Sequence, residues 1–140
     1  MISGKFKFPG DSQSMVAARE FAMDFIRPHC SSELEEIDIF IALQEALANA
    51  VFHGCENNPS KTICCRVEID ASAFTITISD PGPGFDPDAV TKFTEGGTNT
   101  TERGRGICLM RSLMNEVTYG HEGSEVHLRK TRALPPPTLA

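Results

Sequence analysis

The stretch TICCRVEIDASAFTITISD, residues 62–80, contains two runs in which apolar and polar residues alternate. Residues 62–69 and 74–79 have the period of two that is typical of β-strands, and the short segment 70–72 between them favours a turn. Apolar side chains therefore gather on one face of each strand. The sequence predicts an antiparallel sheet with one face covered by helices and the other exposed to water. The inward residues are Ile63, Cys65, Val67 and Ile69, followed by Phe74, Ile76 and Ile78.

Two helices are predicted before this hairpin. Asp11 or Ser12 can cap the first helix, and Pro28 stops it. The second helix begins near residues 31–32 and ends at Gly54, which suits the left-handed conformation that often terminates a helix. Four apolar residues of the first helix fall at roughly helical spacing and are expected to face the core: Val16, Phe21, Phe25 and Ile26.

Further elements are expected at both ends of the chain. Residues 5–8 favour a strand, residues 106–114 a third helix, and residues 116–119 with 125–130 a second hairpin. The predicted fold class is an α+β two-layer sandwich. Its sheet is mixed but mainly antiparallel, and helices cover one face of it.

Composition limits both the fold and the function. The chain has 140 residues, enough for one domain with its own core, and its net charge of −6 disfavours a protein that binds duplex nucleic acid. No run approaches the roughly 18 apolar residues of a membrane-spanning helix, so no membrane association is expected. The five cysteines show no CxxC pair and no export signal precedes them, which indicates reduced thiols and a cytoplasmic location.

The second helix carries polar residues where its apolar pattern predicts core. It is apolar on two sides, yet Glu45 lies among Ile41, Ala48 and Phe52, and Asn49 lies about 40° from Glu45 on the same face. A carboxylate and a carboxamide flanked by apolar side chains must face a polar cavity, because burying them without polar partners costs their solvation free energy. The alternative is a solvated stripe shared with Asp38.

A second polar position follows the second strand. Asp80 keeps the parity of the inward residues of that strand, and it opens the hexapeptide Asp80-Pro-Gly82-Pro-Gly84-Phe85. Glycines allow the backbone to approach a ligand closely. An inward carboxylate followed by a pair of glycines is therefore a candidate ligand site rather than a simple turn.

A third feature is the segment Gly104-Arg105-Gly106, which we expect to open the third helix. Free N–H groups and the helix dipole at such a position can bind an anion. The preceding loop, residues 86–103, contains Gly96-Gly97 and is long enough to act as a mobile lid. Ser124 has the inward parity of Val126 and can deliver a hydroxyl to the same pocket.

In this order the three segments resemble the N, G1 and G2 boxes of the ATP-binding superfamily that includes gyrase, histidine kinases and MutL. The N box spans residues 45–54, the G1 box 80–85 and the G2 box 104–110. The chain is most similar to the anti-sigma-factor serine kinases of bacteria, single domains whose N box ends in His-Gly. The resemblance covers residues 3–130. It implies the Bergerat ATP-binding fold for a domain at 1–130, and leaves residues 131–140 as a Pro-rich tail expected to be disordered.

The resemblance also implies roles for individual residues. Asn49 resembles the Mg²⁺ ligand, Asp80 the acceptor for the amino group of adenine, and Glu45 the base that activates a serine of the protein substrate. Gly82 lets the base approach, and Ser124 assists Asp80 through water. Arg105 and the N–H groups near it hold the phosphates. The full set expected to bind ATP is Asn49, His53, Asp80, Gly82, Gly84, Gly104, Arg105, Gly106 and Ser124.

Three functions remain open at this point. The first is an ATP- and Mg²⁺-dependent anti-sigma factor that sequesters a sigma factor and phosphorylates an STAS-domain antagonist. The second is an ATP-regulated binding module without kinase activity, which the presence of Glu45 disfavours. The third is a detached histidine-kinase domain, which is disfavoured because no histidine lies in a phosphoacceptor hairpin. The expected partners are the sigma factor and the antagonist, with a homodimer allowed and no direct nucleic-acid contact.

Overall fold

The computed structural model describes residues 1–91 and 101–133, and its sheet has the order β1-β2-β3-β5-β4. All four strand pairings in the described part are antiparallel. The expected α+β sandwich is confirmed, although none of these pairings supplies the parallel component of a mixed sheet. The strands are β1 (Ile2–Gly10), β2 (Asn58–Ile69), β3 (Ala73–Ser79), β4 (Glu116–Gly120) and β5 (Glu125–Thr131).

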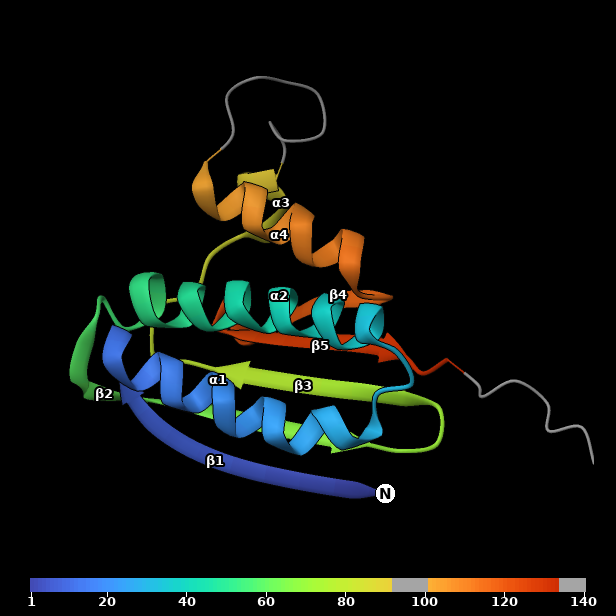
Figure 1. Ribbon diagram of the computed structural model, residues 1–140. Coiled ribbons are helices and arrows are strands. Elements are labelled where there is room, and N and C mark those ends of the chain that lie inside the picture. Colours follow the sequence, from blue (N-terminus) through green and yellow to red (C-terminus); the bar gives the residue numbers. More distant parts are fainter. Residues whose placement is uncertain (92–100, 134–140) are drawn as a thin grey trace, which may run out of the picture.

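The helices lie on one side of this sheet (Figure 1). Helix α2 runs between α1 and α4 and contacts both. The other sheet face carries polar side chains such as Thr77 and Glu125, so one face is covered and the other is wet, as the alternation predicts. The helices are α1 (Ser12–Ile26), α2 (Glu33–Asn49), α3 (Pro87–Thr91) and α4 (Glu102–Leu113), with short turns η1 (Arg27–His29), η2 (Ala50–Gly54, π-helical) and η3 (His121–Gly123).

The core lies between the inward strand faces and the helices. All seven inward residues predicted for β2 and β3 are buried, and Val126 and Leu128 of β5 join them. The prediction for α1 is partly wrong, because Val16 and Phe21 are 47% and 57% exposed. Small Ala18 and Ala22 turn toward the sheet instead and let the helix approach closely, and Phe21 packs on the edge strand against Phe6. The core face of α1 is made by Met15, Ala18, Ala22, Met23 and Ile26.

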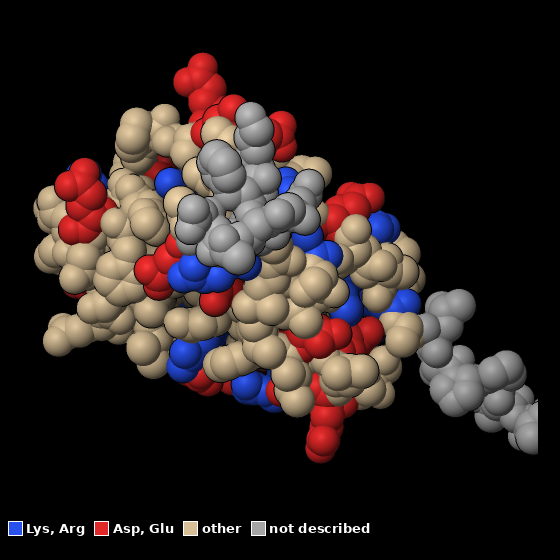
Figure 2. All heavy atoms as spheres, turned by 90° about the horizontal axis from the view of Figure 1, so that it is seen from above, with Lys and Arg blue, Asp and Glu red and all other residues tan. Residues whose placement is uncertain are grey.

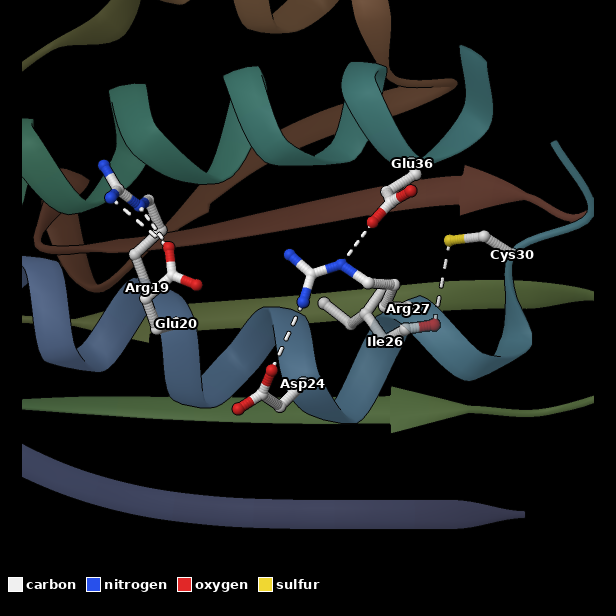
Figure 3. A network of polar contacts seen from close by, with 7 residues as sticks. All are labelled: Arg19, Glu20, Asp24, Ile26, Arg27, Cys30 and Glu36. Carbon is white, nitrogen blue, oxygen red and sulfur yellow. Dashed lines mark hydrogen bonds and ion pairs between the residues drawn. The ribbon is translucent and has the colours of Figure 1, made fainter. Parts of the chain in front are cut away.

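Polar contacts join α1 to α2 (Figure 3). Arg27, the first residue of η1 directly after α1, forms ion pairs with Asp24 of α1 and with Glu36 of α2. The N-caps are the predicted ones, since Asp11 accepts a hydrogen bond from the Ser14 N–H and Ser32 accepts one from the Glu35 N–H. These caps fix where α1 and α2 begin.

Residues 131–133, which follow the expected domain boundary at residue 130, still contact the domain. Strand β5 continues to Thr131, the Arg132 guanidinium donates to the Asp70 and His29 carbonyls, and the Ala133 N–H donates to Glu35. The rest of the predicted tail, residues 134–140, lies outside the described residues. The predicted lid around Gly96-Gly97 also lies outside them.

All five cysteines are free thiols, and on β2 Cys65 is buried while its neighbour Cys64 is only partly buried. Seen from above, acidic and basic side chains intermingle on this face of the molecule (Figure 2). In the parts of the chain that the structure covers, no helix has the length and apolarity needed to cross a membrane.

Candidate functional site

Helix α2 supplies the first two candidate residues, and they lie where its pattern predicts. Glu45 and Asn49 are one turn apart and both are partly buried. The Glu45 carboxylate faces α4, because a Cβ atom added to Gly106 would lie 2.6 Å from Glu45 Oε2. Gly106 therefore leaves room for Glu45 between the two helices. Asp38, the expected neighbour in a solvated stripe, is instead paired with Lys130 of β5 at 3.1 Å.

An open cleft lies beside these residues, with a free volume of about 160 Å³. Its walls include Glu45, Asn49, His53 and Glu102. Burial lowers the pKa of the His53 imidazole, and the positive charge of Arg103 lowers it further, while Glu102 opposes this shift. The cleft thus brings two carboxylates, an amide and an imidazole together at one end of α2.

Asp80 follows β3 and points inward, as its parity predicts. Its carboxylate is partly buried and accepts a hydrogen bond from the Gly82 N–H at 2.8 Å, while its own N–H donates to the Ser124 carbonyl at 3.0 Å. Burial raises the pKa of this carboxyl group above its usual value, and the Gly82 hydrogen bond and Arg103 act in the opposite direction. Both contacts hold the carboxylate at the end of the sheet.

Gly54 packs directly against this carboxylate. A side chain at position 54 would overlap the Asp80 carboxyl group. The prediction of a left-handed terminating glycine here was wrong, because positive φ angles occur instead at Glu56 and Asn57. Gly54 is required for close packing of the turn after α2 against Asp80, a contact between segments far apart in the sequence.

The glycine loop after Asp80 pairs with the turn between β4 and β5. Phe85 N–H donates to the Glu122 carbonyl at 2.9 Å, and Gly84 has φ +76° where it approaches that carbonyl. Gly82 packs on Gly54, since a Cβ at Gly82 would lie 2.7 Å from the Gly54 carbonyl oxygen. The Ser124 hydroxyl lies at the cavity but donates to the His121 carbonyl at 2.9 Å. Of these residues Ser124 lines the cavity beside Asp80, while Gly82 and Gly84 shape the loop that leads to it.

The segment Gly104-Arg105-Gly106 lies inside a helix rather than opening one, which corrects the predicted start of α4. Thr101 caps the helix, and its side chain accepts from the Gly104 N–H at 3.0 Å while its carbonyl accepts from the Arg105 N–H at 3.0 Å. These two N–H groups are therefore engaged in the helix start and are not free for an anion. Arg105 is exposed.

The cavity beside Asp80 contains two residues that the sequence analysis missed. Arg103 places its guanidinium carbon 3.4 Å from the centroid of the Phe85 ring, and Tyr119 meets the same ring edge-on at 5.2 Å. Both line the cavity with Asp80, Asn49 and Ser124. Arg103 was overlooked because α4 was expected to begin after it, and Tyr119 because β4 was examined only as a hairpin strand. The inward parity of Tyr119 with Val117 was the available signal.

Polar atoms that are unpaired among the described residues surround this cavity. Within the described residues, three buried polar atoms here have no hydrogen-bond partner: Asn49 Nδ2, Arg103 Nε and Tyr119 Oη. An unsatisfied buried group costs about 1–3 kcal/mol, so such atoms favour a polar partner. Burial raises the pKa of Tyr119 to about 12, so its hydroxyl keeps its proton. No group of three His, Cys, Asp or Glu side chains in the described part is arranged for a metal ion. A Mg²⁺ ion held by one protein oxygen together with phosphates and water needs no such group.

Comparisons with known proteins agree with this geometry. The chain is 30% identical to an anti-sigma F factor of Anoxybacillus flavithermus, with 91% of this chain and 94% of the relative covered. It is 29% identical to an anti-sigma F factor of Clostridium acetobutylicum, with 93% and 94% covered, and 28% identical to one of Clostridium botulinum, with 89% and 90% covered. Residues 8–130 match the histidine kinase-like ATPase domain. The resemblance inferred from the three boxes is confirmed, and the chain belongs to the family of histidine kinase-like ATPase domains.

Proposed function

We propose that this protein is an ATP-dependent anti-sigma factor and serine kinase. In this proposal it binds a sigma factor and phosphorylates a serine of an STAS-domain antagonist in the cytoplasm. The observation that carries the proposal is the position of the Asp80 carboxylate, which is held between Gly54 and Gly82 beside a cavity that also contains Asn49. The relatives named anti-sigma F factor support the choice of partner.

Asp80 and its neighbours are assigned to the adenine base. One carboxylate oxygen, Oδ1, accepts from the Gly82 N–H, and the other can accept from the exocyclic amino group of adenine. Ser124 lines the same cavity and supplies a hydroxyl near this position. The phosphates then extend toward the cleft at the end of α2, which His53 lines. Arg105, exposed in the first turn of α4, is assigned to the phosphates as well. The N–H groups of Gly104 and Arg105 would have to leave the helix start to contribute.

Asn49 and Glu45 are assigned to the chemical step. Asn49 lines both the Asp80 cavity and the open cleft, which supports the proposal that its amide oxygen would hold Mg²⁺. When bound, Mg²⁺ neutralises phosphate charge. Glu45 opens onto the 160 Å³ cleft. That space admits the hydroxyl of a serine from the partner, and the Glu45 carboxylate can take the proton of this hydroxyl.

The decisive experiment is phosphoryl transfer to the antagonist. The protein is incubated with Mg²⁺, ATP labelled on the γ-phosphate and the STAS-domain protein encoded nearest its gene. The wild type should label the antagonist, while Glu45→Gln should lose about 10²–10⁴ in rate and still bind ATP. Glu33→Gln is the matched control, because Glu33 is exposed in the first turn of the same helix.

Two results would contradict the proposal. A wild-type protein that binds ATP but labels no STAS partner would leave the ATP-regulated binding module as the better account. Full labelling by the Glu45→Gln protein would remove Glu45 from the base role while leaving the kinase activity established.

A further inference from the structure

Arg103 occupies the cavity that the proposed function assigns to adenine. Its guanidinium carbon lies 3.4 Å from the centroid of the Phe85 ring, which is van der Waals contact. It comes from the first turn of α4, whereas Phe85 follows the glycine loop after β3. The contact therefore closes the cavity with a side chain from a different element.

The cavity that Asp80 itself lines does not admit a base. With Arg103 in place the free volume of the cavity is about 20 Å³, enough for about one water molecule. Phe85 lines this cavity together with Asp80 and Arg103, so a purine ring that enters it to reach Asp80 lies beside the Phe85 ring. The guanidinium and the base are both planar groups that stack on an aromatic face, so they compete for the same surface.

The Arg103 side chain is partly buried, and one nitrogen of its guanidinium lacks a partner among the described residues. Arg103 Nε is buried without a hydrogen-bond partner among the described residues, and burial lowers the pKa of the group, whereas the negative charge of Asp80 favours its charged form. A charged group with incomplete hydrogen bonding keeps much of its desolvation cost. Moving Arg103 back to solvent recovers that cost, which makes exchange for a ligand feasible.

We propose that the Arg103 guanidinium holds the base position in the free protein and that adenine binds only by displacing it from Phe85. This inference rests on the proposed recognition of adenine by Asp80. It makes Arg103 a built-in competitor that sets the affinity for nucleotide.

Adenosine is the appropriate probe, since it carries the base without phosphates that Arg103 could attract. Calorimetry on the full chain should show adenosine binding about 2- to 30-fold more tightly to Arg103→Ala than to the wild type, the range that corresponds to a cation–π contact. Arg103→Lys keeps the charge but loses the planar group and should also bind more tightly. Arg111→Ala removes the same charge from the exposed last turn of α4 and should leave the affinity unchanged. An Arg103→Ala protein that binds adenosine equally or more weakly overturns the inference.

A second experiment follows the position of the Arg103 side chain directly and does not depend on a difference in adenosine affinity. In the NMR spectrum of the free protein, the side-chain Nε–H of Arg103 should be shifted by the ring current of Phe85, and Phe85→Leu should abolish that shift. Saturation with adenosine should abolish it in the wild type as well. A missing shift in the free protein, or a shift that persists at saturation, contradicts the displacement.

Failure of the proposed function and failure of the Arg103 displacement give different results. If neither the wild type nor Arg103→Ala binds adenosine or ATP, the proposed function is wrong and the inference falls with it. If the wild type binds both ligands but Arg103 stays on Phe85, only the inference fails.

Discussion

The replacement Asp80→Asn tests the assignment of the adenine site most directly. The asparagine carbonyl can still accept from the Gly82 N–H, which lies 2.8 Å from Asp80 Oδ1 in the wild type. Its amide nitrogen would then face the amino group of adenine, so that two donors meet in a partly buried site. We expect the loss of about 1–3 kcal/mol that accompanies an unsatisfied buried polar group, or about 5- to 150-fold in ATP affinity.

The same replacement should not weaken folding. Burial raises the pKa of the Asp80 carboxyl group in the folded protein above its value in the unfolded protein. The group therefore contributes its full stabilisation at pH values below the unfolded pKa. That contribution is lost as the pH rises through the folded pKa. At neutral pH the folded protein therefore holds a carboxylate in a position that disfavours its charge. Asparagine is neutral, so the midpoint of thermal unfolding at pH 7 should be equal to or higher than that of the wild type.

Two measurements on one sample check this prediction. Calorimetric titration with ATP and Mg²⁺ reports the affinity, and thermal unfolding without nucleotide reports the stability. Asp86→Asn removes a nearby exposed carboxylate of the same charge and should change neither. Undiminished ATP affinity in a folded Asp80→Asn protein would refute the assignment of Asp80 to adenine.

Three further substitutions test the packing and the metal site. Gly54→Ala places a methyl group against the Asp80 carboxylate, so we expect a loss of about 1–3 kcal/mol in unfolding free energy, measured by urea titration, together with weaker ATP binding. Gly106→Ala places a methyl group within 2.6 Å of Glu45 Oε2, so it should slow phosphoryl transfer more than it weakens ATP binding. Equal losses in both assays would argue against a role of Glu45 in the chemical step. Asn49→Ala should make ATP affinity less dependent on Mg²⁺ in a titration at fixed ionic strength, and a wild type that binds ATP without any Mg²⁺ dependence would exclude the metal role.

Much of the framework of the site follows from local sequence. The alternation in residues 62–80 indicates which strand faces are buried, and all the predicted inward side chains are buried in the structure. The same parity carries Asp80 inward, and helical spacing places Glu45 and Asn49 on one side of α2. These features depend on the periods of strands and helices, which are properties of neighbouring residues.

The contacts that complete the site are decided by tertiary structure. No local pattern shows that Gly54 accommodates Asp80, that Gly106 accommodates Glu45, or that Val16 and Phe21 lie outside the core. The Arg103 guanidinium reaches Phe85 only because α4 begins at Glu102 and packs beside the loop that follows β3. Side-chain volume and hydrogen bonding between distant segments set these positions, and they arise only when α2, α4 and the end of β3 meet in the folded protein.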